Sequence, residues 1–251
     1  MTHRRPLALV LAATLGGLAG CGGDPAPPLA AITLDASRVA VAGLSSGASM
    51  ATQVHVALNS RVQGAALVAG GPYGCAQGQL ETALGPCMTA QPALPETATL
   101  IASAEQRAAQ GTIDPLSAFD GDRVFVMHGT RDALVSPSLA PVTADVLRAL
   151  AGDSAKVTLD DQRAFGHGWP TLDAGAPCEQ PVSPWLLDCG IDAAGETMAA
   201  LFGVEASPPA AAAAASNGTL ARFDQRELAP EGAAGLADTG FVYTPTACAG
   251  A

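Results

Sequence analysis

A serine, an aspartate and a histidine are the residues of this chain whose types and order suit nucleophilic chemistry. Ser45 lies in the turn Gly43-Leu44-Ser45-Ser46-Gly47, between a β-branched run and a helix-like run. Such a turn lifts the serine hydroxyl above a sheet and points the next backbone N–H, that of Ser46, toward the same place. Gly43 and Gly47 are expected to let the helix pack close to the strand. Ser45 is therefore the candidate nucleophile, and the alternative is a Gly/Ser-rich turn without chemistry.

A serine hydroxyl needs a general base, which in turn needs an orienting acid. After a turn of this kind the expected chain order is serine, then acid, then histidine. Asp132 follows the apolar run 124–127, and His167 lies in a glycine-bracketed loop at 165–170. Ser45, Asp132 and His167 then form the predicted catalytic set. His128, at the end of the apolar run, is the second choice for the base, and His55 is interpreted as a structural helix residue.

Composition limits the class of protein. The chain has 251 residues, of which 49% are hydrophobic, which is enough for one sizeable domain with a core. Its net charge is −11, and no basic cluster lies beyond the N-terminus, which argues against a nucleic-acid partner. No Cys-x-x-Cys motif or histidine cluster indicates a metal site. We expect neither a metal nor a cofactor.

The N-terminus is predicted to be a targeting segment. Arg4 and Arg5 precede an apolar run at 7–18, which is too short for a permanent span and ends in Leu18-Ala19-Gly20-Cys21. This resembles a bacterial lipobox and predicts a signal peptide at 1–20, lipidation of Cys21 and a Pro/Gly-rich tether at 21–32. The alternative is an ordinary secretory signal. We expect an exported protein, in the cell envelope or extracellular, that meets the membrane only through a lipid anchor.

Five further cysteines follow. An oxidising compartment favours disulfides, and two pairs are close in sequence: Cys75 with Cys87, and Cys178 with Cys189. Each pair is predicted to staple a loop, and the second would hold the loop of His167. Cys248 is left without a partner.

Strand-like and helix-like segments alternate between residues 38 and 243. Strands are predicted at 38–42, 65–69, 123–127, 156–159, 220–223 and 241–243, and helices at 46–58, 97–110, 138–151 and 193–202. Such alternation is typical of an α/β sheet with helices on both faces. The nucleophile strand of an ordinary hydrolase with this turn is the fifth, but here only the tether precedes residue 38. The strands near 220 and 241 therefore suggest a circularly permuted sheet within one domain at 33–251.

Several stretches together resemble the exported poly(3-hydroxybutyrate) depolymerase family of permuted α/β hydrolases. They are Gly43-Leu44-Ser45-Ser46-Gly47, Gly70-Gly71-Pro72-Tyr73-Gly74-Cys75, His128-Gly129-Thr130-Arg131-Asp132, Gly166-His167-Gly168-Trp169-Pro170, Ser183-Pro184-Trp185, Cys189-Gly190-Ile191-Asp192 and Thr239-Gly240-Phe241-Val242-Tyr243-Thr244-Pro245. The resemblance spans nearly all of 33–248. It implies Ser45 as nucleophile, Asp132 as orienting acid, His167 as base, esters of short 3-hydroxyacids as substrates, and no cofactor.

The chain also departs from this family. After the segment that ends at Cys248, the family continues with a second cysteine and a strand that ends in an oxyanion turn. This sequence stops at Ala251. The expectation is a truncated catalytic domain or a shortened gene model, with the Ser46 N–H acting without its second donor at a cost of about 10²–10³ in rate.

The predicted function is hydrolysis of poly- or oligo(3-hydroxybutyrate)-type esters through an acyl-enzyme. Tyr73, Trp169 and Trp185 are candidates for a hydrophobic subsite. Two other functions stay open: a general short-acyl or feruloyl-type esterase, and a catalytically impaired surface lipoprotein that only binds. The oligomeric state is not predicted.

Overall fold

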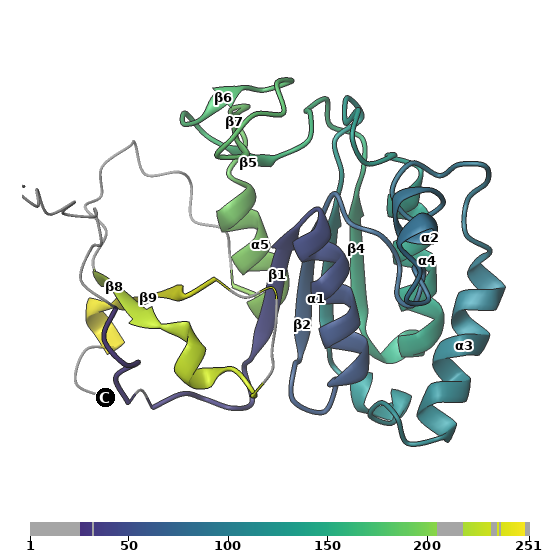
Figure 1. Cartoon of the computed structure of the whole chain (residues 1–251), viewed down its shortest axis with the longest axis horizontal. Helices are drawn as coiled ribbons and strands as arrows, with labels where there is room; N and C mark the ends of the chain where they lie inside the picture. The colour runs from purple at the N-terminus through teal and green to yellow at the C-terminus, as the bar shows by residue number, and fades with distance from the viewer. Residues whose placement is uncertain (1–25, 32, 205–217, 232–234, 236, 249–251) are drawn as a thin grey trace, which may run out of the picture. The chain divides into compact units, whose positions relative to one another are not determined.

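The computed structural model describes residues 26–31, 33–204, 218–231, 235 and 237–248 (Figure 1). It divides into two compact units, one of Leu34–Ala213 and one that combines Met1–Thr33 with Ala214–Ala251. The expected signal peptide and Cys21 lie outside the described residues. The domain limits expected from the sequence stay a prediction.

A four-stranded parallel sheet forms the centre of the larger unit. Its strands are β1 (Ala40–Leu44), β2 (Gly64–Val68), β3 (Arg123–Met127) and β4 (Lys156–Asp160), in the order β1-β2-β3-β4. β2 is buried throughout, and β3 at every residue after Arg123. Parallel strands covered on both faces need such continuous apolar runs. The sheet confirms the predicted α/β class.

Helices cover both faces of this sheet (Figure 1). α1 (Ser46–Ala57), α3 (Thr97–Ala109) and α4 (Leu139–Ala151) share one apolar core with Leu67 and Val126. α5 (Ala193–Phe202) shares a second core with Val68 and Met127. Because successive strand residues point to opposite faces, neighbours such as Leu67 and Val68 belong to different cores. The sheet is therefore fixed from both sides, and its carboxyl ends are available for a site.

Several short helices and strands were not predicted from the sequence. α2 (Leu80–Leu84) and a small sheet of β5 (Trp169–Thr171), β7 (Leu186–Asp188) and β6 (Ala176–Pro177) follow the carboxyl ends of β2 and β4 in the chain. The 3-10 helices are Leu116–Phe119, Gly152–Ser154, Gln225–Leu228 and Thr246–Cys248. Elements of two to five residues are too short to show a hydrophobic period. In the part of the chain that is described, no helix has the length and apolar character that a membrane crossing requires.

The smaller unit contains an antiparallel pair, β8 (Gly218–Asp224) and β9 (Thr239–Pro245). Both strands were expected from the sequence, but as parts of a permuted main sheet. Among the described residues they pair with each other and belong to the smaller unit, so their expected place in a permuted main sheet stays a prediction. Two strands of equal length that follow one another in the chain pair at a small cost in loop closure. The described residues thus leave β1 as an edge of the main sheet.

Both predicted disulfides are present. Cys75 pairs with Cys87 across 12 residues, and Cys178 pairs with Cys189 across 11. Cys248 is free and exposed. Two disulfides are consistent with export to an oxidising compartment.

Candidate active site

Ser45 lies at the sharp turn between β1 and α1. Its backbone has a φ of 60° and a ψ of −121°, a region that residues other than glycine rarely adopt. The Ser45 N–H donates to the Val68 carbonyl at 2.9 Å, and the Ser45 carbonyl accepts from the Ser49 N–H at 3.0 Å. These bonds hold the strained turn between the sheet and the first turn of the helix. Strained backbone conformations of this kind are concentrated at functional sites, which supports a functional role for Ser45.

The two glycines of the turn differ. A Cβ on Gly43 would overlap the backbone of Gly47 and Ala48, so the sequence expectation for Gly43 holds. A Cβ on Gly47 would meet nothing within 4 Å. The expected steric need for a glycine at position 47 is therefore wrong, because the close approach is made at Gly43 alone.

Ser46 is the first residue of α1. The N–H groups of a first helical turn have no partner within the helix, and they lie at the positive end of its dipole. The Ser46 N–H is thus placed at the carboxyl end of β1 beside the Ser45 hydroxyl. A developing negative charge at this point would find a donor there.

Asp132 follows β3, and both oxygens of its carboxylate accept hydrogen bonds. Its Oδ1 accepts from the N–H groups of Leu134 at 2.8 Å and Val135 at 2.9 Å. Its Oδ2 accepts from His167 Nδ1 at 2.8 Å and from His128 Nε2 at 3.1 Å. Burial of the carboxyl acts to raise its pKa, but these four hydrogen bonds outweigh burial and hold the pKa of Asp132 well below its ordinary value. Asp132 is therefore an anion that orients two histidines.

His167 presents one ring nitrogen to Asp132. Since the ionised carboxylate only accepts hydrogen bonds, Nδ1 carries the proton and Nε2 of the neutral ring is left as the basic atom. The ring is buried and meets the Trp185 ring edge-on, with centroids 6.1 Å apart. No hydrogen bond joins His167 to Ser45 in the described part of the chain. Such bonds are often long without substrate and tighten in the complex.

The loop that carries His167 is attached to the loop that carries Asp132. Two N–H groups of the Asp132 loop donate to carbonyls of the other, Thr130 to Arg163 at 2.9 Å and Arg131 to Phe165 at 3.1 Å. A Cβ on Gly129 would overlap the Phe165 carbonyl, so the two backbones touch there. The two loops therefore form one rigid support for the acid and the base.

A disulfide closes the far side of the His167 loop. The Gly166 N–H donates to the Cys178 carbonyl at 2.9 Å, and Cys178 is bonded to Cys189. The Arg163 guanidinium binds Glu196 of α5 and Asp160 at the end of β4. Hydrogen bonds to Glu196 raise the pKa of Arg163, so this cross-link is permanently charged. The predicted task of this disulfide, to hold the His167 loop, agrees with its position.

His128 has a different place from the one expected for a base. Its Nε2 lies 3.1 Å from both Asp132 Oδ2 and the Val135 carbonyl, which are two acceptors, so Nε2 carries a proton. Its Nδ1 is buried without a partner. His128 is therefore a second donor to the acid, on the same carboxylate oxygen that His167 binds. The spacing His128-x-x-x-Asp132 was the available signal for this contact.

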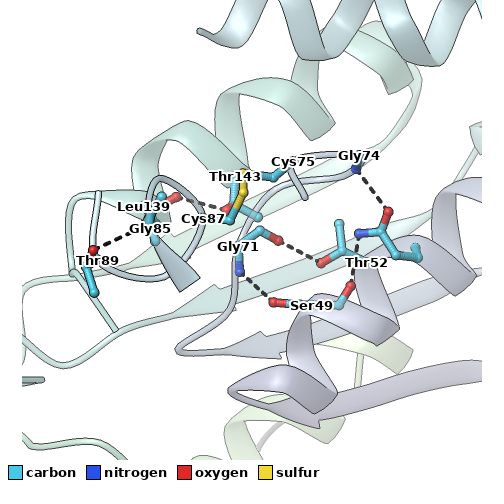
Figure 2. Close-up of a disulfide and its surroundings, with 11 residues drawn as sticks. Ser49, Thr52, Gly71, Gly74, Cys75, Gly85, Cys87, Thr89, Leu139 and Thr143 are labelled. Carbon is cyan, nitrogen blue, oxygen red and sulfur yellow. Dashed lines mark hydrogen bonds between the residues drawn. A yellow bond between two sulfur atoms is a disulfide. The ribbon is translucent and has the colours of Figure 1, made fainter. Parts of the chain in front are cut away.

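A cavity of about 440 Å³ opens at Ser45. Its walls come from α1, the loop after β2, α2 and the Cys75–Cys87 disulfide. Figure 2 shows how side chains of α1 hold this loop: Gly71 N–H donates to Ser49 Oγ at 3.2 Å, and Thr52 Oγ1 donates to the Gly71 carbonyl at 3.4 Å. The sequence did not predict this wall, because it depends on α2 and on contacts distant in the chain.

The three aromatic candidates for a substrate subsite have different environments. Tyr73 is buried in the core. Trp169 is partly buried and packs against the second core. Trp185 is 40% exposed and lies against His167. The structure brings only Trp185 of the three into contact with a residue of the predicted catalytic set. In the described ranges, no group of His, Cys, Asp or Glu is arranged to hold a metal ion.

The chain is similar in sequence to known depolymerases. No family model matches the chain. It is 34% identical over 229 residues to a poly(3-hydroxybutyrate) depolymerase of Delftia acidovorans, covering 88% of the chain and 44% of the relative. It is 29% identical over 231 residues to a polyhydroxybutyrate depolymerase of Talaromyces funiculosus, covering 89% of the chain and 64% of the relative. The chain thus spans about half to two thirds of the length of these relatives.

Solved structures of PHB depolymerases are also similar to this chain in fold. The crystal structure of PHB depolymerase from Penicillium funiculosum superimposes with a TM-score of 0.71 at 27% identity, covering 89% of this chain and 67% of that one. A serine-to-alanine variant of a PHB depolymerase, complexed with an R3HB trimer, gives 0.70 at 26% identity, covering 90% and 68%. In sequence and in fold, the chain is therefore a relative of the poly(3-hydroxybutyrate) depolymerases, built on the α/β-hydrolase fold.

Proposed function

We propose that this chain is a serine esterase that hydrolyses poly- or oligo(3-hydroxybutyrate)-type esters with Ser45, Asp132 and His167. One observation carries the proposal: the strained Ser45 turn opens on a cavity after β1, while the Asp132–His167 pair is fixed on the loops after β3 and β4, at the same edge of the sheet. The relatives named as depolymerases, one of them bound to an R3HB trimer, support the substrate class.

The reaction begins with proton transfer. His167 Nε2 takes the Ser45 proton as Ser45 Oγ attacks the ester carbonyl, and Asp132 stabilises the charged imidazole. The Ser46 N–H donates to the oxyanion of the tetrahedral intermediate. Collapse breaks the ester C–O bond, and His167 returns the proton to the departing alkoxide. Water then attacks the acyl-enzyme by the same route, which releases a carboxylic acid and restores Ser45.

The cavity fits a flexible ester of modest size. Its lining is mostly small or apolar and includes Met50, Leu84, Met88 and the two cysteines of the disulfide. Such a surface accepts methyl-branched aliphatic units without a fixed hydrogen-bond pattern. A bulky aromatic acyl group of the feruloyl type would need a flat slot between the walls of the cavity. A general short-acyl esterase is the alternative function that the substrate panel below tests.

Location is part of the same proposal. We infer an exported protein anchored through a lipid on Cys21, supported by the lipobox-like sequence and by the two disulfides. The disulfides are also consistent with a secreted protein without an anchor. Metabolic labelling with a palmitate analogue distinguishes the two, with Cys21→Ala as its control.

Labelling with a fluorophosphonate probe tests the nucleophile directly. Purified wild-type chain should label, and Ser45→Ala should not. Ser49→Ala is the matched control, since it removes a hydroxyl from the wall of the same cavity and should still label. Folded protein that does not label would refute the esterase and favour a binding role.

A substrate panel then separates the two esterase functions. Hydrolysis of a 3-hydroxybutyrate trimer should exceed that of p-nitrophenyl butyrate and methyl ferulate at equal concentration. The reverse order would favour the general esterase.

A further inference from the structure

The cavity at Ser45 has one charged residue in its wall. Arg107, from the last turn of α3, lines it, and every other residue of the described lining is neutral. The chain as a whole carries a net charge of −11, so the positive charge in this wall is opposite in sign to the net charge of the protein. A single cation in a neutral cavity indicates a ligand with a negative group.

The Arg107 guanidinium is held in position but has free donors. It lies 5.9 Å from the centroid of the Tyr73 ring, and Tyr73 is buried and fixed in the core. At this distance the guanidinium is within cation–π range of the ring, and this contact uses none of its N–H donors. Among the described residues, no hydrogen bond or ion pair to this guanidinium occurs. Arg107 thus offers donors that are not used within the described residues to a carboxylate in the cavity.

The contacts of Gln53 and Tyr73 indicate that Arg107 lies toward the end of the cavity away from Ser45. The wall formed by α1 runs from Ser46 to Gln53, seven residues or roughly 10 Å along a helix. Gln53 Oε1 accepts from the Gly74 N–H at 2.9 Å, and Gly74 follows Tyr73, whose ring lies near the Arg107 guanidinium. A ligand that reaches from Ser45 to Arg107 must therefore span on the order of 10 Å.

The polarity of a polyester decides which fragment lies in this cavity. Each chain has a hydroxyl end and a carboxyl end, and cleavage of any ester leaves the free carboxylate on the fragment that departs as the alcohol. An extended peptide advances about 1.2 Å per backbone bond, so a four-bond 3-hydroxybutyrate unit covers roughly 5 Å. Two units then fill the distance between Ser45 and Arg107.

We propose that Arg107 binds the terminal carboxylate of the departing fragment, so that the site takes 3-hydroxyalkanoate oligomers with a free carboxyl end and cuts about two units from it. The proposal rests on the proposed esterase function. In the step concerned, the ester C–O bond breaks and the departing alkoxide takes the proton of His167. The carboxylate on Arg107 is unchanged.

Paired substrates test this subsite. The 3-hydroxybutyrate tetramer is compared with its methyl ester, which lacks the negative end. The free acid should have the higher kcat/KM, by about tenfold for one charge-assisted hydrogen bond at an exposed site. Its main product should be the dimer from the carboxyl end. Arg107→Gln should bring the ratio of the two kcat/KM values close to one.

Arg61→Gln is the matched control, since it removes the same charge from an exposed position outside the cavity. It should leave the ratio as in the wild type. A ratio unchanged in Arg107→Gln, or a wild type that does not distinguish the two substrates, would overturn the subsite.

A binding measurement separates failure of the subsite from failure of the esterase. Titration calorimetry of the 3-hydroxybutyrate trimer is made on Ser45→Ala and on the double variant Ser45→Ala/Arg107→Gln. Weaker binding by about tenfold in the double variant supports the subsite even if the wild type hydrolyses nothing. Equal binding in the two variants contradicts it.

Discussion

Two buried histidine–aspartate pairs lie at the two ends of β3. Asp122 directly precedes the strand and meets His55 Nε2 at 2.9 Å, whereas Asp132 follows the strand and meets His167 Nδ1 at 2.8 Å. The first pair is enclosed by protein: the His55 ring packs edge-on against Phe119, and its Nδ1 is buried without a hydrogen-bond partner among the described residues. The second lies on a loop that shares a cavity with Ser45, since Val135, whose N–H donates to Asp132, lines that cavity. The comparison shows that the pair alone is not a catalytic signature, and that what surrounds the second nitrogen of the histidine decides its role.

The largest difference between the pairs should appear in turnover. His167→Ala should lower kcat by about 10⁴–10⁶, since removal of the base of a serine nucleophile costs this much. His55→Ala should keep kcat within about threefold once the fraction of folded protein is taken into account. Hydrolysis of a chromogenic ester measures both. Loss of turnover in folded His55→Ala would show that the two pairs are coupled.

The pair at the amino end of β3 should matter for stability instead. His55→Ala leaves the Asp122 carboxyl buried without its side-chain partner, and such a removal costs about 3–5 kcal/mol of the free energy of unfolding. Urea denaturation followed by circular dichroism measures this. The double variant His55→Leu/Asp122→Leu should recover part of the loss, because no unpaired charge remains. A single variant as stable as the wild type would contradict a structural role.

The second histidine on Asp132 should have a smaller effect. His128→Phe removes one hydrogen bond to the acid and should lower kcat by about tenfold with little change in KM. His128→Gln keeps an N–H donor and should recover part of the rate. Steady-state kinetics on one ester measure both variants. An effect on KM alone would show that His128 acts on the substrate and not on Asp132.

The smallest effect is expected in the dependence of stability on pH. The pKa of Asp132 is lowered in the folded chain, so the unfolded chain binds the proton more readily. The stability that Asp132 contributes is complete above its unfolded pKa of about 3.9 and is lost as the pH falls toward the lower folded pKa. Asp132→Asn should therefore lose less stability than the wild type between about pH 5 and about pH 3. Denaturation curves with equal slopes against pH would disprove this.

Local patterns in the sequence predicted most of the larger unit. β3 and α5 have the predicted limits, because a bounded apolar run and a capped helix are visible without tertiary contacts. Asp192, for example, caps α5 by accepting from the Gly195 N–H at 2.9 Å. The order of Ser45, Asp132 and His167 along the chain was visible for the same reason. Their positions at the ends of β1, β3 and β4 follow from a parallel sheet.

Long-range contacts account for what the sequence did not predict. Tyr73 looks like a loop aromatic in the sequence, but the loop folds inward and its ring becomes part of the core. Arg107 looks in the sequence like an ordinary solvent-facing helix arginine, but α3 brings it to the cavity wall. The pairing of β8 with β9 depended on which of two partners each strand would choose, and strand patterns do not show this.

The short spacing of the two disulfides has a consequence for how the chain matures. Correct pairing closes loops of 12 and 11 residues, whereas joining Cys87 to Cys178 would close a loop about eight times longer and cost about 2 kcal/mol more in chain entropy. Both cysteines of each native pair are present once its own short segment has been made, before the later cysteines follow. The cavity wall and the support of His167 can therefore oxidise independently and in order, and Cys248 meets cysteines that are already paired.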